Sequence, residues 1–159
     1  MTAPVDRADV AGCYACDLSS GREPLVGGRI GATSRWVVEH CMGPLGVGTL
    51  IVKPLRHVLD LASLDEVEAE EMGPLLKEAA RVVTELTHCD RVYVSLWSHA
   101  NWEPVHIHFV VQPVFHSMKE TYSNPGPTLQ SEMFRANEPL PTAEVETFCD
   151  EARRLMRMS

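Results

Sequence analysis

The segment EPVHIHFVVQP, residues 103–113, places two histidines two residues apart in an otherwise apolar run. A short apolar run rich in Val, Ile and Phe predicts a buried strand. Alternate side chains of a strand share one face, so we expect His106, His108 and Val110 to point the same way. Paired imidazoles on such a strand are metal ligands, catalytic groups or hydrogen-bonded core residues, and the segment alone leaves all three open.

Composition and charge limit the classes of protein to which the chain can belong. It has 159 residues, 45% apolar and 23% charged, which is typical of one soluble globular domain. The formal charge of −8 predicts repulsion of duplex nucleic acid, although a local pocket can still bind a small phosphate compound. No run reaches the roughly 18 apolar residues that cross a bilayer, and the N-terminus lacks the apolar core of a signal peptide. We therefore expect a cytoplasmic protein with no membrane partner.

Hydrophobic periodicity predicts an α+β domain. The predicted strands are SRWVVEHC (34–41), GVGTLIVKP (46–54), RVYVSLW (91–97) and VHIHFVVQPV (105–114). Apolar residues recur at helical spacing over 63–90, where Ser63 and Glu66 match a capping box, and a second amphipathic helix is predicted over 142–158. This order of elements indicates an antiparallel sheet of about five strands with a central helix and a C-terminal helix.

Three regions are predicted along the chain. Residues 1–11 form an N-terminal arm, residues 12–116 form the main domain, and residues 117–159 form a C-terminal extension that packs on the same domain. The polar stretch 117–141, with SNPGPT and NEPLP, predicts a long loop, and loops of this length often cover a functional site.

The stretch CYAC places Cys13 and Cys16 three residues apart, near the start of the main domain. An odd total of five cysteines without an export signal argues against a disulfide framework, and a C-x-x-C in the cytosol is typical of metal or redox chemistry. His57, just after a predicted strand, and one strand histidine complete a Cys2His2 set, the ligand count of a structural zinc. The spacing is too long for a zinc finger, so two buried thiols remain the alternative.

Three stretches, in this order, resemble the histidine-triad (HIT) family of nucleotide hydrolases and transferases. They are the N-terminal C-x-x-C, GTLIVKPLRH (48–57) and an H-x-H strand that ends in proline. The resemblance covers roughly residues 12–115 and implies the HIT-like fold for them. In that family a proline lies seven residues after the first histidine, as Pro113 does after His106.

This register assigns roles to individual residues by resemblance. It implies that a structural zinc is held by Cys13, Cys16, His57 and His106. It also implies that His108 is the nucleophile, a neutral imidazole that attacks an α-phosphate and forms a nucleotidyl-histidine, which water or a second acceptor resolves. The attacking ring needs its other N–H held by an acceptor such as a backbone carbonyl. The expected ligand is a small nucleotide or phosphate ester, and the expected assembly is a homodimer.

The candidate substrate contacts depart from the family pattern. Val110 occupies the position of the third His or Gln, and losing one such hydrogen-bond donor can cost about 10²–10³ in rate. The segment ANWEPV (100–105) replaces a small, hydroxyl-bearing segment and places Trp102 and Glu103 before the histidines. Cys41 lies near the position that holds the ribose hydroxyls in the family.

Two other functions therefore stay open. A HIT-like protein that kept the zinc and the fold could bind nucleotides or phosphates without turnover, because Val110 removes a phosphate contact. Alternatively, His106 and His108 could both hold a catalytic metal, with Glu103 as the general base. A closed Cys2His2 site would exclude this metalloenzyme, because it leaves no open coordination position.

Overall fold

A computed structural model describes residues 9–98 and 102–158 of the chain. Most of the predicted N-terminal arm and the first two residues of ANWEPV lie outside this part. The strands are β1 (Gly31–Ala32), β2 (Trp36–His40), β3 (Leu50–Pro54), β4 (Arg91–Trp97) and β5 (His108–Val114). The α-helices are α1 (Tyr14–Ser20), α2 (Glu66–Thr87), α3 (Pro127–Ala136) and α4 (Thr142–Leu155), with 3-10 turns at Leu61–Ser63 and His116–Glu120.

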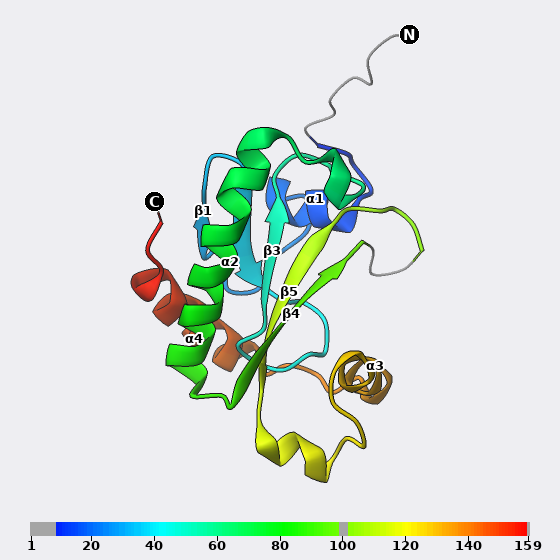
Figure 1. Cartoon of the computed structure of the whole chain (residues 1–159), viewed down its shortest axis with the longest axis vertical. Helices are drawn as coiled ribbons and strands as arrows, with labels where there is room; N and C mark the ends of the chain where they lie inside the picture. The colour runs from blue at the N-terminus through cyan, green and yellow to red at the C-terminus, as the bar shows by residue number, and fades with distance from the viewer. Residues whose placement is uncertain (1–8, 99–101, 159) are drawn as a thin grey trace, which may run out of the picture.

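The described strands form one five-stranded antiparallel sheet in the order β1-β2-β3-β5-β4 (Figure 1). The predicted α+β class is therefore confirmed, including the central and C-terminal helices. Within the described part of the chain, no helix is both long enough and apolar enough to cross a membrane.

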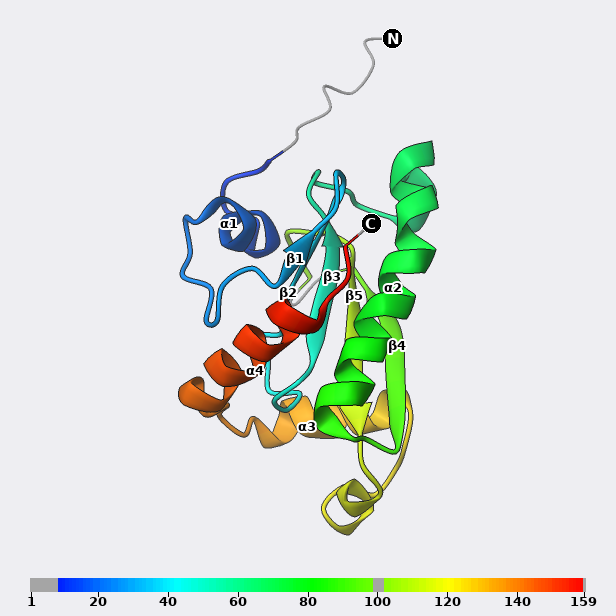
Figure 2. The ribbon, with the colours of Figure 1, turned by 90° about the vertical axis from the view of Figure 1, so that its left-hand side faces the viewer.

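The two faces of the sheet carry different side chains because successive strand residues point to opposite sides. On one face, Val38 pairs with Val52, which pairs with Phe109, and these residues pack with α2 and α4 in the main core. The opposite face carries Val110, which packs with Leu129 of α3 in a smaller cluster. Figure 2 shows α1 and α2 on opposite sides of the sheet. The face with α1 and α3 is the one that carries the candidate site.

The start of α2 differs from the sequence prediction by two residues. Asp65 is the N-cap and forms the capping box with Glu68, whereas the sequence predicts Ser63 with Glu66. The hydroxyl of Ser63 instead bonds to Asp60 in the preceding 3-10 turn. Both placements match the same sequence pattern, and this local bond decides between them.

The polar stretch 117–141 is not the loop that the sequence predicts, because it contains α3. Pro127 lies in the first helical turn and Asn137 adopts a left-handed conformation at the C-terminal end, both common at helix boundaries. Only Leu129, Gln130 and Met133 of this helix are buried, so its apolar periodicity is too short to detect.

A chain of side-chain hydrogen bonds holds α3 on the sheet. The indole N–H of Trp97 donates to Gln130 Oε1 at 3.2 Å, and Gln130 Nε2 donates to Gln112 Oε1 at 3.0 Å. Both glutamines are buried, so these bonds satisfy amide groups that water does not reach. The C-terminal extension is thereby fixed beside the histidine strand.

Candidate metal centre and adjoining cavity

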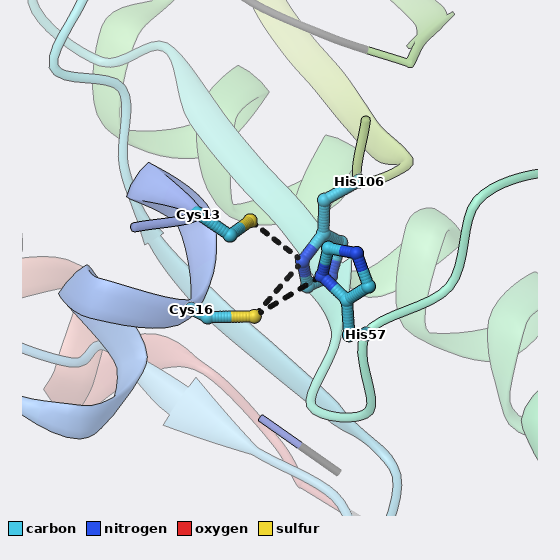
Figure 3. Close-up of side chains that lie close together, drawn as sticks. All are labelled: Cys13, Cys16, His57 and His106. Atoms are coloured by element: carbon cyan, nitrogen blue, oxygen red, sulfur yellow. Dashed lines mark hydrogen bonds between the residues drawn. The ribbon is translucent and has the colours of Figure 1, made fainter. Parts of the chain in front are cut away.

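Four side chains from three separate segments meet beside the sheet (Figure 3). Their ligand-type atoms all lie within 4.8 Å of one another, and the residues are Cys13, Cys16, His57 and His106. Cys13 is at the N-cap position of α1 and Cys16 lies one turn further on, so both thiols share one side of the helix. His57 follows β3, and His106 precedes β5. The structure thus brings together the four residues that the resemblance implies as zinc ligands.

The distances in this cluster match the edges of a tetrahedral site. The Cys16 sulfur lies 3.4 Å from Nδ1 of His57 and 3.4 Å from Nδ1 of His106, while the Cys13 sulfur lies 3.6 Å from the latter. Zinc–sulfur bonds of about 2.3 Å and zinc–nitrogen bonds of about 2.0 Å in tetrahedral geometry place S and N about 3.5 Å apart. Two soft sulfurs and two imidazole nitrogens are also a donor set that zinc favours.

His106 is oriented by the backbone behind it. Its Nε2 lies 3.1 Å from the carbonyl oxygen of Pro54, so the N–H donates there and Nδ1 is left as an acceptor facing the thiols. The hydrogen bond from Cys16 lowers the pKa of Cys13 to about 3, and the same bond raises the pKa of Cys16. The lowered pKa favours the thiolate at Cys13, and a thiolate is the form that binds metal.

A cavity of about 280 Å³ adjoins the cluster on the same face of the sheet. Among the predicted substrate residues, Cys41, Glu103 and Val110 line it, together with the predicted nucleophile His108. Trp102 is 85% exposed and is not among the described residues that line this cavity. Four of the five residues predicted for catalysis and substrate binding therefore share one lining.

His108 begins β5 with its ring half-buried at the cavity. Its Nδ1 lies 3.0 Å from the carbonyl oxygen of His106, which accepts the ring N–H. Burial lowers the pKa of His108, so the neutral ring predominates near pH 7. This tautomer leaves the lone pair on Nε2, the nitrogen that a nucleophilic role requires.

Val110 is an apolar part of the lining. It is only 3% exposed and packs against Leu45, Leu129 and Met133. The third histidine or glutamine of the family pattern thus has no polar replacement at this position.

Sequence reasoning missed two features of the cavity. The first is a buried ion pair between Glu39 and Lys53, whose Nζ lies 2.5 Å from Oε1. The sequence shows an acid and a lysine on two predicted strands, but only the observed pairing of β2 with β3 places them on one face of the sheet. The second is Phe134, whose ring centroid lies 5.5 Å from that of Trp97, and both side chains line the cavity.

No family model matches the chain, and no curated protein matches its sequence. Solved structures do match, beginning with a HIT-like protein from Bartonella henselae at a TM-score of 0.70 and 17% identity, covering 94% of this chain and 100% of that one. A hypothetical histidine triad nucleotide-binding protein from Sulfolobus tokodaii matches at a TM-score of 0.67 and 13% identity, covering 89% and 90%. A zinc-bound histidine triad family protein from Mycobacterium smegmatis matches at 0.59 and 20%, covering 88% and 94%. The chain therefore has the histidine-triad fold.

Proposed function

We propose that the chain is a HIT-type enzyme that hydrolyses or transfers a nucleotidyl group through a covalent intermediate on His108. The observation that carries this proposal is the 3.0 Å contact between His108 Nδ1 and the carbonyl oxygen of His106. Because the backbone accepts the N–H at Nδ1, Nε2 is unprotonated in a cavity large enough for part of a small nucleotide. The fold shared with a histidine triad nucleotide-binding protein supports the ligand class.

The proposed reaction has two displacement steps. In the first, Nε2 of His108 attacks the α-phosphorus, a P–N bond forms, and the bond to the leaving group breaks with the electron pair departing on that group. In the second, water or another acceptor attacks the phosphorus, the P–N bond breaks and the neutral imidazole is regenerated. Glu103 is exposed at the cavity and is the candidate for transferring protons to the leaving group and from the water.

We further propose that Cys13, Cys16, His57 and His106 hold a structural zinc ion. The donor types and the sulfur–nitrogen distances of 3.4–3.6 Å support it. With four protein ligands, a bound zinc ion would have no open position for substrate. Its role would therefore be to hold the site rigid. His106 would then be fixed, and its carbonyl oxygen would in turn fix the ring of His108.

A catalytically impaired nucleotide-binding protein is the second candidate, and Val110 favours it. An apolar, 3% exposed side chain cannot stabilise developing charge on a phosphate. The metalloenzyme alternative has less support. The metal-type cluster found among the described residues includes His106 but not His108, whose Nδ1 faces a carbonyl oxygen instead. A homodimer stays a prediction from the resemblance, which sedimentation would check.

The experiment that tests the proposed enzyme uses p-nitrophenyl esters of nucleoside 5′-monophosphates. The protein is mixed with each ester, quenched at alkaline pH and analysed by intact mass spectrometry. We expect a nucleotidyl adduct in the wild type and in His116→Ala, whose histidine is exposed outside this cavity, and none in His108→Ala. A wild type that binds nucleotides but forms neither adduct nor nitrophenol with any ester would leave the binding protein as the function.

A further inference from the structure

Two charged side chains lie side by side in the wall of the cavity, on strands where apolar residues are the rule. Glu39 comes from β2 and Lys53 from β3, both are 1% exposed, and both line the cavity. In the sheet register, Glu39 pairs with Ile51 and Lys53 with Val37, so the two charges are diagonal neighbours on one face. A pair of well-packed apolar side chains in place of these charges would stabilise the fold at least as well.

The pair leaves one acceptor unused. Lys53 Nζ donates to Glu39 Oε1 at 2.5 Å and to the carbonyl oxygen of Ala15 at 2.8 Å. Glu39 Oε2 has no hydrogen-bond partner among the residues that the structure describes, and it is the single buried side-chain polar atom there of which this is true. A buried carboxylate oxygen without a donor destabilises the fold, so its retention beside a cavity points to a donor on the ligand.

The rest of the lining agrees with a ligand that carries N–H groups. Lys53 is the only lysine or arginine among the described lining residues, and its charge is already used by Glu39. The lining therefore presents a hydrogen-bond acceptor rather than a cationic phosphate clamp at this wall. Elsewhere in the same cavity, Trp97 and Phe134 supply aromatic surface for a planar ring.

We propose that Glu39 contacts the nucleobase: its Oε2 accepts a hydrogen bond from an N–H of the base. The inference rests on the proposed nucleotide site and names the group that Glu39 contacts, an amino group or ring N–H, which every standard nucleobase carries. Lys53 is the positioning residue, because it fixes Oε1 and so fixes the direction of Oε2. Bulk water does not compete for this oxygen, and a charged acceptor strengthens the bond, so we expect about 10- to 100-fold discrimination.

The test compares nucleotides with analogues that lack every ring and exocyclic N–H. Dissociation constants are measured by calorimetry for the 5′-monophosphates of adenosine, inosine and guanosine against purine riboside 5′-monophosphate. Cytidine and uridine 5′-monophosphates are compared with pyrimidin-2-one riboside 5′-monophosphate. For at least one base, the wild type is expected to bind the N–H-bearing nucleotide at least about 10-fold more tightly than its reference.

The decisive variant is Glu39→Leu/Lys53→Met, which removes both charges without leaving either one buried alone. We expect its preference for the N–H-bearing nucleotide over the reference analogue to fall below about 3-fold. Glu146→Gln, at an exposed glutamate on α4, is the matched control and keeps the full preference. If the double variant does not fold, Glu39→Gln serves instead, because a neutral acceptor weakens the bond and reduces the preference at least about 3-fold.

The outcomes separate this inference from the proposed function. Nucleotides that bind without any N–H preference, or a preference that survives in Glu39→Leu/Lys53→Met, would overturn the role of Glu39 and leave the nucleotide site intact. A wild type that binds none of these nucleotides would overturn both. A preference lost with Glu39 and kept in the control would establish Glu39 as the residue that reads the base.

Discussion

His106 and His108 lie two residues apart in the chain, yet their side chains belong to different sites. His106 is 2% exposed, and its two ring nitrogens face two cysteine sulfurs and a backbone oxygen. His108 is half-buried, and among the described residues only its Nδ1 has a hydrogen-bond partner. A closed set of partners suits a structural role, whereas an open nitrogen at a cavity suits chemistry.

The same contrast extends to the surroundings of each histidine. The metal-type cluster has all four residues that the HIT resemblance implies, with matching distances. The cavity instead has Val110 where the family has a hydrogen-bond donor, and it has the buried Glu39–Lys53 pair. The metal-type cluster is thus closer to the family pattern than the cavity lining is. A difference in substrate from other members of the family would arise from the cavity lining.

The largest expected effect separates the two histidines by function. His108→Ala is predicted to lower turnover of an activated nucleotide ester by more than about 10³-fold, because it removes the nucleophile. Metal content and thermal stability should stay near wild type. His106→Ala is the matched variant, and it should lose metal and stability together. Equal loss of metal in both variants would contradict the division between the two sites.

The buried ion pair is predicted to matter most when it is broken on one side. Lys53→Met removes the partner of Glu39 and leaves a buried carboxyl group unpaired in the cavity wall, which should lower the free energy of unfolding by about 3–5 kcal/mol. Glu39→Leu/Lys53→Met should recover most of this loss. Urea denaturation of both variants measures the difference. If the double variant is as unstable as the single one, the pair is required for folding and its retention needs no ligand.

A hydrogen-bond donor introduced at position 110 should make the cavity more similar to the family pattern. Val110→Gln is predicted to raise kcat for the activated esters by about 10-fold, since an amide N–H can reach a phosphate oxygen. Val110→Ala is the control, because it changes the volume without adding a donor, and it should give no gain. Steady-state kinetics of the two variants would show whether Val110 limits catalysis, and an equal rate in both would indicate that it does not.

The smallest expected effect concerns the attachment of α3. Gln130→Leu removes the link between Trp97 and Gln112 and should lower the free energy of unfolding by about 1–2 kcal/mol. Faster amide hydrogen exchange in α3 should accompany it, while Ser131→Ala, an exposed change on the same helix, should alter neither. Unchanged exchange in Gln130→Leu would mean that apolar packing alone holds α3.

Each element of the fold could be predicted from the sequence only where its apolar residues are dense or regularly spaced. Segments 34–41, 46–54, 91–97 and 105–114 all contain observed strands, because their β-branched and apolar residues are dense enough to indicate burial. The helix 127–136 was missed, since it buries only three residues, and one of them, Gln130, is held by hydrogen bonds to Trp97 and Gln112. Three buried positions, one of them a glutamine, are too few to give a detectable apolar period.

The candidate site was predictable where residue type alone is informative. Cysteine pairs and strand histidines are rare enough that Cys13, Cys16 and His106 stand out in the sequence, and the structure brings them together with His57. Glu39 did not stand out, because one charged residue in a strand is normally the solvent-facing partner of apolar neighbours. Only the pairing of β2 with β3 places it beside Lys53.

The most direct test of this account is the zinc content per chain of the purified wild type, Cys13→Ala/Cys16→Ala and His108→Ala. The account predicts one zinc per chain in the wild type, none in the cysteine variant and one in His108→Ala, because His106 and His108 serve different sites. Zinc that disappears with His108 would place both strand histidines on the metal and would contradict the nucleotidyl-histidine mechanism.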